Sequence, residues 1–218
     1  MDIKQYAVIG LGRFGTSIAR KLHDAGQEVL GIDVIEERVE DAELYVTHAV
    51  VADSTEEKAL TSLEIGNFDC VIIAIGNDLQ ANILTAMLLK DLGVKKIIAK
   101  ALEKRHGELL KKIGVDWIVY PERDMGERVG NQLLSPNLLN YIELSKEYNI
   151  EEIMIPQSMA EKTFRELDIR AEYNVNAIAL IRDGTIHISP SADEVIHQND
   201  VLVLLGKTED LANFSKKE

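Results

Sequence analysis

The first 33 residues follow the order strand, glycine turn, helix, strand, and this order constrains the fold more than any other feature of the chain. Residues 6–9 form a short apolar run that fits a buried parallel strand, and apolar residues recur at helical spacing directly after the glycines. A second apolar strand follows over residues 29–32. The pattern predicts a βαβ unit whose glycines lie at the strand-to-helix junction.

The glycine turn contains Gly10, Gly12 and Gly15, with Arg13 and Phe14 between the last two. In such a turn the first glycine permits the tight bend, the second lets a phosphate approach the backbone, and the third lets the helix pack closely on the sheet. Free amides at the helix start then face the anion. The sequence therefore predicts a nucleotide site here, and a purely structural glycine turn is the alternative.

Asp33 follows Gly15 by 18 residues, at the end of the second strand. This is close to the offset of roughly 20 residues expected of a carboxylate that accepts hydrogen bonds from ribose hydroxyls, and such a carboxylate would repel a 2'-phosphate. Later strands end at the same edge of a doubly wound sheet, where the ligand is held. The residues that we expect to frame adenine and ribose there are Asp53, Ser54, Ile75, Gly76 and Asn77.

Two charged residues could lie near the phosphates. Arg13 sits inside the glycine turn, and its guanidinium matches phosphate geometry, whereas a solvated arginine at a helix start would be disfavoured by the helix dipole. We therefore predict a phosphate contact for Arg13. Glu122 follows Pro121, where either an ordinary helix-start carboxylate or a role near the phosphates fits the sequence.

The composition excludes several classes of protein. The formal charge of −13 argues against a nucleic-acid surface, which needs a basic stripe to displace counterions. The single cysteine, Cys70, lies in an apolar run, so we expect a buried core residue, and one cysteine allows no disulfide within the chain. The start of the chain has no apolar signal region, and no stretch is apolar enough to span a membrane. We expect a cytosolic, soluble protein.

Strands and helices alternate through residue 121. Further apolar strands are predicted over residues 46–51, 69–75, 96–100 and 116–120, separated by helices of ordinary length. Such alternation implies parallel pairing and right-handed helical crossovers. The fold class is therefore α/β, with a Rossmann-like doubly wound parallel sheet over residues 1–121, which we predict to be the nucleotide-binding domain.

Residues 122–147 break this regularity. Residues 122–134 and 137–145 each place apolar side chains on one helical stripe, and no parallel strand follows. The pattern predicts two connecting helices. Their apolar stripes need a partner, and we favour another copy of the chain over folding back onto the same domain.

Residues 148–218 contain short strands without long helices between them, which predicts a small α+β domain. Strands are expected over residues 153–155, 175–181, 185–189 and 201–206. Asp183 and Gly184 stand between the second and third of these, and Asp-Gly is a hairpin signal. No Gly/Ser-rich linker precedes this domain, so we expect an ordered attachment.

The residues for catalysis are not evident. A hydride-transferring enzyme needs a general acid or base and a pocket for its second substrate. None of the five histidines has a recognised catalytic spacing, and we interpret each as a surface or strand-end residue. A non-enzymatic protein is therefore favoured over a small NAD-dependent oxidoreductase. A third hypothesis is an acidic adaptor with a vestigial glycine turn.

Taken together, the motifs resemble the RCK (TrkA-N/TrkA-C) family of cytosolic regulators of potassium conductance, and within it the gating subunits of Ktr-type potassium uptake systems. The resemblance covers the whole chain. It rests on the glycine turn in residues 7–15, the fourth strand in 71–76, the start of the connecting helix in 121–126, and residues 167–171 and 188–190 near the carboxyl end.

The resemblance implies a homodimer that assembles into an octameric ring and docks on a membrane-embedded potassium-translocating subunit. The chain would then be cytoplasmic and peripheral at the inner face of the membrane. ATP and ADP would bind the amino domains, with NAD(H) less favoured. Asp33 would bind ribose, and Arg13 would contact the γ-phosphate of ATP, including from a neighbouring subunit. Glu122 would hold a divalent cation such as Mg²⁺ or Ca²⁺.

The resemblance also implies a second ligand. Related subunits bind cyclic di-AMP across the dimer interface of the carboxyl-terminal domain. The matching positions in this chain are Arg170, Asn176, Ala177 and Pro190.

Overall fold

A computed structural model of the chain describes residues 3–134 and 137–215. Contacts divide the chain into two compact units, Met1–Asp124 and Met125–Glu218. The division falls inside helix α6 (Pro121–Leu134). Among the described residues, no helix combines the length and the apolar character needed to cross a bilayer.

The first unit is built on a six-stranded sheet in which every pair is parallel. The strand order is β3-β2-β1-β4-β5-β6. This confirms the predicted doubly wound class, because the chain proceeds outward from β1 in one direction and then returns to start again at β4. The strands are β1 (Gln5–Ile9), β2 (Glu28–Asp33), β3 (His48–Val51), β4 (Cys70–Ile73), β5 (Ile97–Lys100) and β6 (Trp117–Val119).

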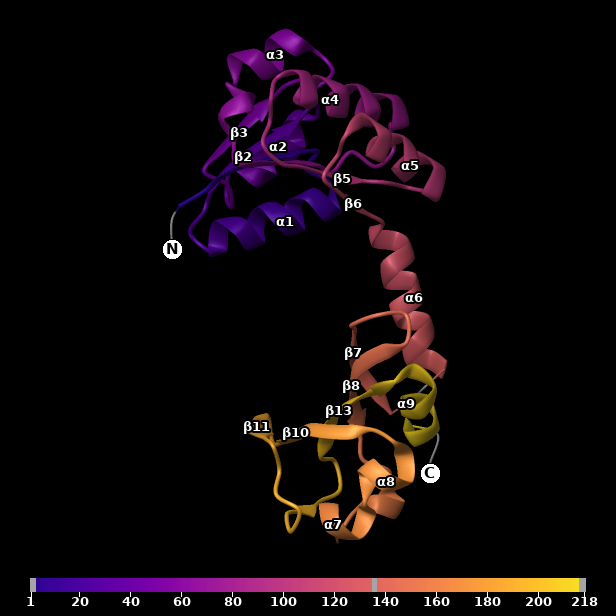
Figure 1. Cartoon of the computed structure of the whole chain (residues 1–218). Coiled ribbons are helices and arrows are strands. Elements are labelled where there is room, and N and C mark those ends of the chain that lie inside the picture. The colour runs from indigo at the N-terminus through magenta and orange to yellow at the C-terminus, as the bar shows by residue number, and fades with distance from the viewer. Residues whose placement is uncertain (1–2, 135–136, 216–218) are drawn as a thin grey trace. The chain divides into compact units, whose positions relative to one another are not determined.

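Apolar side chains bury both faces of this sheet. In β1, Ala7 and Ile9 belong to one core cluster, and Val8 belongs to the other. Figure 1 shows α4 and α5 on one side of the sheet and α1 on the other. The helices are α1 (Arg13–Asp24), α2 (Glu36–Ala42), α3 (Glu57–Ser62), the short 3-10 helix η1 (Ile65–Asn67), α4 (Leu79–Asp91) and α5 (Lys104–Ile113).

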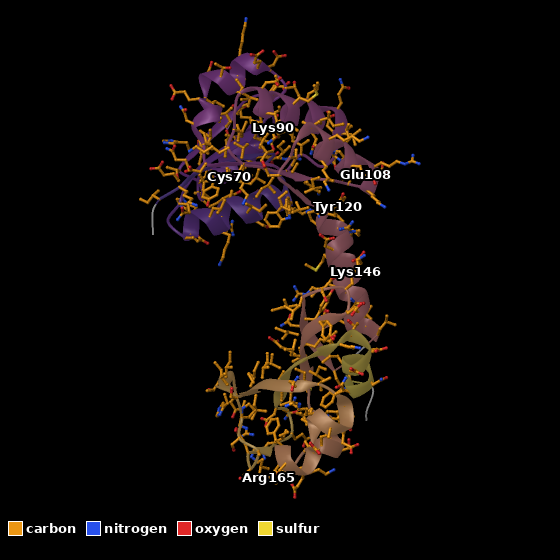
Figure 2. All side chains as sticks on the ribbon, viewed as in Figure 1. Cys70, Lys90, Glu108, Tyr120, Lys146 and Arg165 are labelled. Carbon is orange, nitrogen blue, oxygen red and sulfur yellow. The ribbon has the colours of Figure 1, made fainter. Side chains whose placement is uncertain are left out.

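Cys70 lies at the start of β4, inside the first unit (Figure 2). It is a free, buried thiol whose pKa is raised by burial. This confirms the predicted core residue. A thiol kept protonated in an apolar environment is a poor nucleophile.

The second unit is an antiparallel sheet of order β11-β10-β13-β8-β7, with a separate two-stranded pair of β12 and β9. Its core cluster includes Ile153, Leu180 and Phe214, all fully buried. The predicted small α+β domain is thereby confirmed. Its strands are β7 (Leu138–Glu143), β8 (Tyr148–Met154), β9 (Lys162–Thr163), β10 (Asn176–Arg182), β11 (Thr185–Ile188), β12 (Val195–Ile196) and β13 (Val201–Lys207). Its helices are η2 (Gln157–Met159), α7 (Phe164–Leu167), α8 (Ile169–Tyr173) and α9 (Thr208–Ser215).

The Asp-Gly turn forms as expected. Arg182 pairs with Thr185 across the hairpin, and both turn residues have positive φ, 48° at Asp183 and 76° at Gly184. Positive φ at both central residues is the type I' geometry that matches the twist of a two-residue hairpin.

The prediction of a helix over residues 137–145 is wrong. Leu138–Glu143 is strand β7, paired antiparallel with β8, and residues 135–136 lie outside the described parts of the chain. The register shifts between Leu138 and Asn140, so one extra residue interrupts the strand's alternation. The bulge produces apolar positions that imitate helical spacing. The other expected connecting helix, over residues 122–134, is confirmed as part of α6.

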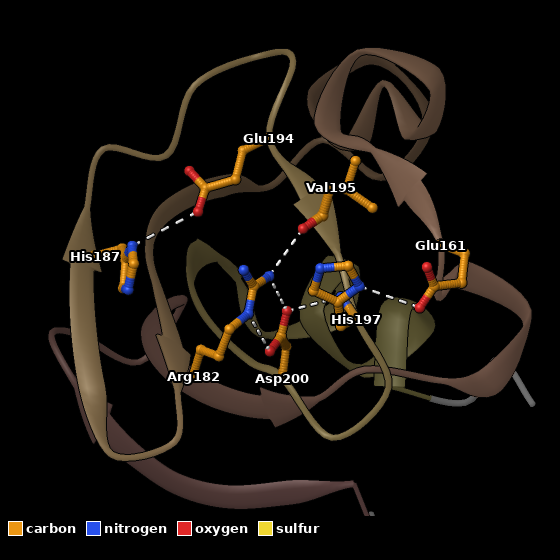
Figure 3. Close-up of polar contacts among 7 residues, drawn as sticks. All are labelled: Glu161, Arg182, His187, Glu194, Val195, His197 and Asp200. Carbon is orange, nitrogen blue, oxygen red and sulfur yellow. Dashed lines mark hydrogen bonds and ion pairs between the residues drawn. The ribbon is translucent and has the colours of Figure 1, made fainter.

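An ion pair between the half-buried Arg182 and the buried Asp200 joins parts of the second unit (Figure 3). The Arg182 guanidinium donates two hydrogen bonds to Asp200, at 2.6 and 3.0 Å, and a third to the Val195 carbonyl at 2.8 Å. Burial disfavours the charge of Asp200, but the bonds from Arg182 and from the His197 amide outweigh it and lower the Asp200 pKa. Around this pair, His197 contacts Glu161 and His187 lies near Glu194. The cluster joins β10, β12 and the turn before β13.

Candidate nucleotide site

The three glycines of the first turn have different surroundings. Gly10 has φ of 95°, and a Cβ there would lie 3.0 Å from the backbone of Ala74 and of Ile75. A Cβ on Gly15 would lie 1.9 Å from the Gly10 carbonyl oxygen. Among the described residues, no atom lies within 4 Å of a Cβ position on Gly12. The fold therefore explains the first and third glycines, whereas the space over Gly12 is open to a ligand.

Helix α1 starts at Arg13 with Gly12 as its N-cap residue, and no side chain in the described part of the chain caps it. Its first turn contains no acidic residue. The first amides of a helix have no partner inside the helix, and they carry the positive end of the dipole. This end of α1 can accept an anion, and Gly12 leaves room for one at the backbone.

Asp33 ends β2 beside this turn and is 5% exposed. Its Oδ2 accepts a 2.7 Å hydrogen bond from the Leu11 amide and lies 3.4 Å from Arg38 Nη1, and its Oδ1 accepts from the Ile35 amide at 2.9 Å. The carboxylate therefore holds the glycine turn against β2. Each carboxylate oxygen can accept more than one hydrogen bond, so this bracing is compatible with the predicted ribose contact.

Asp53 and Ser54 follow β3 and differ in exposure and in hydrogen-bond partners. Asp53 is exposed, and its Oδ1 accepts hydrogen bonds from the Thr55 hydroxyl at 2.7 Å and from the Thr55 amide at 2.9 Å, which lower its pKa. Ser54 is 4% exposed, and its hydroxyl lies 2.7 Å from that of Thr85 in α4. The Ser54 side chain thus serves the packing of α4, and Asp53 is the more accessible of the two.

The loop after β4 contains the predicted residues Ile75, Gly76 and Asn77. Asn82, in the first turns of α4, donates hydrogen bonds to the Ile75 carbonyl at 2.8 Å and to the Lys100 carbonyl at 3.0 Å. One side chain therefore ties the loop after β4 to the end of β5. Both strands end at the edge where the glycine turn lies, so the loop and the turn lie at the same edge of the sheet.

Lys100 is a member of this edge that the motif analysis missed. It ends β5, its side chain is 10% exposed, and its Nζ lies 2.5 Å from Glu122 Oε1. The same Nζ is 5.9 Å from the Phe14 ring centroid and would be 3.2 Å from a Cβ on Gly76. The signal available in the sequence was a basic residue at the end of an otherwise apolar strand.

Glu122 is the second residue of α6, and this ion pair brings it to the predicted site. The hydrogen bond from Lys100 lowers the pKa of Glu122, and the positive charge of Arg13 contributes a smaller effect in the same direction. Arg13 itself is exposed at the start of α1. The structure thus gathers Gly12, Arg13, Gly76, Lys100 and Glu122 around one edge of the sheet.

The histidine interpretation holds for four residues and fails for one. His23, His48, His187 and His197 are exposed, whereas His106 is 3% exposed within α5. Burial lowers the pKa of His106. The expectation of a surface position is wrong here because the apolar face of α5 turns this side chain toward α4.

In the second unit, the four residues matched to a cyclic dinucleotide lie on separate elements. Arg170 is in α8, Asn176 and Ala177 begin β10, and Pro190 follows β11. Asn176 lines a pocket of about 320 Å³ together with Tyr148, Asn174 and Lys207, among other residues. Of the four, Asn176 alone lines this pocket.

The fold and this edge of the sheet define a Rossmann-like nucleotide-binding domain followed by a small α+β domain. Residues 6–121 match the TrkA-N domain family, and residues 150–217 match the TrkA-C domain family. The chain belongs to this family, the RCK proteins of potassium transport systems.

Three relatives of the chain are potassium uptake proteins, and the match covers nearly the whole length of each. The chain is 46% identical to Ktr system potassium uptake protein C of Bacillus subtilis over 98% of its residues and 97% of that protein. It is 44% identical to Ktr system potassium uptake protein A of the same organism, with 98% and 96% covered. It is 35% identical to Ktr system potassium uptake protein A of Vibrio alginolyticus, with 98% and 97% covered.

Solved structures share the fold at lower sequence identity. The RCK domain of GsuK matches with a TM-score of 0.68 and 21% identity, covering 99% of this chain and 48% of that one. The GsuK channel bound to NAD matches with a TM-score of 0.66 and 22% identity, covering 98% and 39%. These likenesses confirm the RCK architecture expected from the sequence.

Proposed function

We propose that the chain is a non-enzymatic regulatory subunit that binds ATP and ADP and thereby gates a membrane-embedded potassium-translocating subunit. The observation that carries the proposal is the open space over Gly12 at the uncapped start of α1, in a chain closely similar to Ktr potassium uptake proteins. The basic groups at this edge, Arg13 and Lys100, suit the phosphates, and Asp33 suits the ribose.

The proposed assembly is a homodimer that builds an octameric ring on the cytoplasmic side of the membrane. Helix α6 buries none of its described side chains, and Met125, Val129 and Leu133 are 56%, 46% and 78% exposed. An apolar stripe of this kind is typical of a surface that another chain covers. In functional terms we propose residues 1–121 as the nucleotide domain, 122–147 as the connector and 148–218 as the regulatory domain.

Regulation of this kind requires no chemical step. A ligand can shift a ring toward one geometry only by the difference in its affinity for the two states. The γ-phosphate supplies that difference if Arg13, including that of a neighbouring subunit, contacts it in one arrangement and not in the other. The proposed ligands therefore compete for one site but favour different ring shapes.

A divalent cation and a cyclic dinucleotide are the further proposed ligands. Among the described residues, no three His, Cys, Asp or Glu side chains form a metal-binding group. Glu122 would therefore supply one carboxylate to a Mg²⁺ or Ca²⁺ ion whose other ligands are phosphate oxygens, an arrangement that Mg²⁺ commonly adopts. Arg170, Asn176, Ala177 and Pro190 are the proposed contacts of cyclic di-AMP.

Titration calorimetry with ATP, ADP, NADH and cyclic di-AMP tests the proposal. We expect ATP and ADP to bind the wild-type chain, and Arg13→Ala to narrow the ratio of their affinities because the γ-phosphate loses its partner. An unchanged ratio in the variant argues against the role of Arg13. Strong NADH binding with turnover of a second substrate would favour the oxidoreductase alternative. If the chain bound none of these nucleotides, the result would favour the third hypothesis, an acidic adaptor with a vestigial glycine turn.

A further inference from the structure

Asn82 and His106 form a buried pair between α4 and α5 that the proposed function does not use. Asn82 is fully buried and His106 is 3% exposed. The His106 Nε2 atom lies 3.2 Å from Asn82 Oδ1, and His106 Nδ1 accepts a 3.4 Å hydrogen bond from the Leu102 amide. Each of the two side chains therefore bonds both to the other and to backbone groups.

The hydrogen bonds determine which nitrogen of the imidazole carries its proton. The Asn82 amide group donates to two carbonyl oxygens, those of Ile75 and Lys100, so its own oxygen must face His106. That oxygen is an acceptor, so Nε2 must donate, and Nδ1 is left unprotonated to accept from Leu102. An imidazolium would set an Nδ1–H group against the Leu102 N–H group. The contacts therefore require a neutral Nε2–H tautomer.

The two carbonyls that Asn82 bonds belong to the loop after β4 and to the last residue of β5, at the edge of the sheet where the nucleotide is proposed to bind. Ile75 precedes Gly76, and Lys100 carries the ammonium that faces Glu122. Leu102 follows two residues later. The pair thus ties the loop after β4 to the end of β5, next to Gly76 and the Lys100 ammonium, which the phosphates would contact.

We propose that Asn82 and His106 are positioning residues of the nucleotide site, acting through the Ile75 carbonyl and the backbone of Lys100. This inference rests on the proposed nucleotide binding. If the pair is broken, Asn82 Oδ1 and the Leu102 amide lose their partners, and the loops must move to find others. A loop displaced from the ligand loses affinity even though no contact residue has changed.

The test compares ADP binding in His106→Phe with that in Val29→Ala. Val29 is buried in β2 and belongs to the core cluster that contains α1 and α2 residues, on the other face of the sheet from α4 and α5, so its truncation destabilises the first unit away from the pair. We expect His106→Phe to weaken ADP binding roughly tenfold, corresponding to one lost buried hydrogen bond. Val29→Ala should lower the melting temperature and leave ADP affinity within about twofold. His106→Gln, which keeps a donor and an acceptor, should recover part of the lost affinity.

Equal ADP affinity in His106→Phe and wild type overturns the positioning role while leaving the proposed function intact. A wild-type chain that binds neither ADP nor ATP overturns both. An independent measurement on the wild-type chain guards against misfolding of the variant. The ¹⁵N spectrum of the imidazole at pH 7 should show the neutral Nε2–H tautomer, and an Nδ1–H tautomer or an imidazolium would contradict the arrangement.

Discussion

Gly12 and Gly15 belong to one turn, but they constrain different properties of the protein. The Gly15 position faces the Gly10 carbonyl inside the turn, whereas the Gly12 position faces open space. The requirement for glycine at position 15 therefore comes from the fold. At position 12 the described part of the chain gives no steric reason for a glycine. The proposed phosphate gives one, because it would occupy the space that a larger side chain needs.

We expect Gly15→Ala to destabilise the fold and Gly12→Ala to weaken nucleotide binding. A methyl group at position 15 forces the turn or α1 to move, which is an overpacking cost of about 1–3 kcal/mol or more. A methyl group at position 12 has room and changes stability by up to about 1 kcal/mol through the helix cap. Thermal melting and ADP titration of both variants separate the effects. Full ADP affinity in Gly12→Ala would mean that no phosphate lies over that residue.

Glu151 provides a pH-dependent prediction within the second unit. It is 7% exposed on β8, between Leu204 of β13 and Tyr141 of β7, and it accepts a 3.3 Å hydrogen bond from Asn149. Burial raises its pKa. Because the folded pKa lies above the unfolded value, the carboxyl favours folding at low pH, and this contribution is lost as the pH rises through the folded pKa.

Glu151→Gln should therefore stabilise the second unit at pH 8, by about 1.4 kcal/mol for each unit by which the pKa is raised. At pH 4 the carboxyl is protonated and the two forms should have similar stability. Hydrogen–deuterium exchange of the β8 and β13 amides measures the difference. Slower exchange in the variant at pH 8 is the expected result, and faster exchange would show that the charged carboxylate is stabilising.

The local sequence predicted the glycine turn and Asp33 because each role is set by neighbours within one βαβ unit. Lys100 and His106 were not predicted as site residues because their partners lie far away in the sequence. Lys100 meets Glu122 across 22 residues, and His106 meets Asn82 across 24. Such pairings depend on strand register and on which face of a helix turns inward. A local sequence motif contains no information about these two properties.

Among the elements, β7 shows how a spacing pattern can mislead. The bulge at its start places Leu138 in the core and leaves Ile142 61% exposed. A regular strand would have alternated and been predicted as such. The parallel strands of the first unit carried no such irregularity, and their continuous apolar runs identified them. The apolar stripe proposed for assembly is now confined to α6, since residues 137–145 do not form a helix.

The contact between β5 and α6 leads to a prediction about competing charges. Lys100 is bonded to Glu122 in the structure, and a phosphate at the start of α1 would compete for the same ammonium. In EDTA, Glu122→Gln removes the competitor, so we expect ADP to bind roughly two- to fivefold more tightly. Lys100→Met should weaken ADP binding in the same buffer. Calorimetry measures both changes.

With Mg²⁺ present, Glu122→Gln should instead weaken ADP binding, because the proposed cation loses a ligand. Glu108→Gln is the matched control, since it removes one exposed negative charge from α5 (Figure 2) and should have little effect in either buffer. Weaker ADP binding by Glu122→Gln in EDTA would contradict the competition between Glu122 and the phosphate for Lys100.

For the whole molecule, the two units differ in what they contribute to regulation. The first has the start of α1, where we propose that the nucleotide binds, and the second has a pocket beside Asn176. Helix α6 belongs to both, since its first turn contains the Lys100–Glu122 contact and the helix continues past the division between residues 124 and 125. A nucleotide that weakens the ion pair between Lys100 and Glu122 would therefore act on the first turn of α6, the helix that leads to the second unit.

In the proposed function, a bound nucleotide regulates the partner by changing how neighbouring copies of the chain pack against each other. The oligomeric state must therefore be measured. We expect light scattering after size exclusion to give a mass eight times the 24.3 kDa of the chain, with dimers as the smaller species. Leu133→Glu places a charge at a 78% exposed apolar position of α6 and should shift the distribution toward monomers. Glu127→Gln, on the same helix, should leave the mass unchanged. A wild-type chain that stays monomeric with and without ATP would contradict the ring, because a ligand cannot then change how subunits pack against each other.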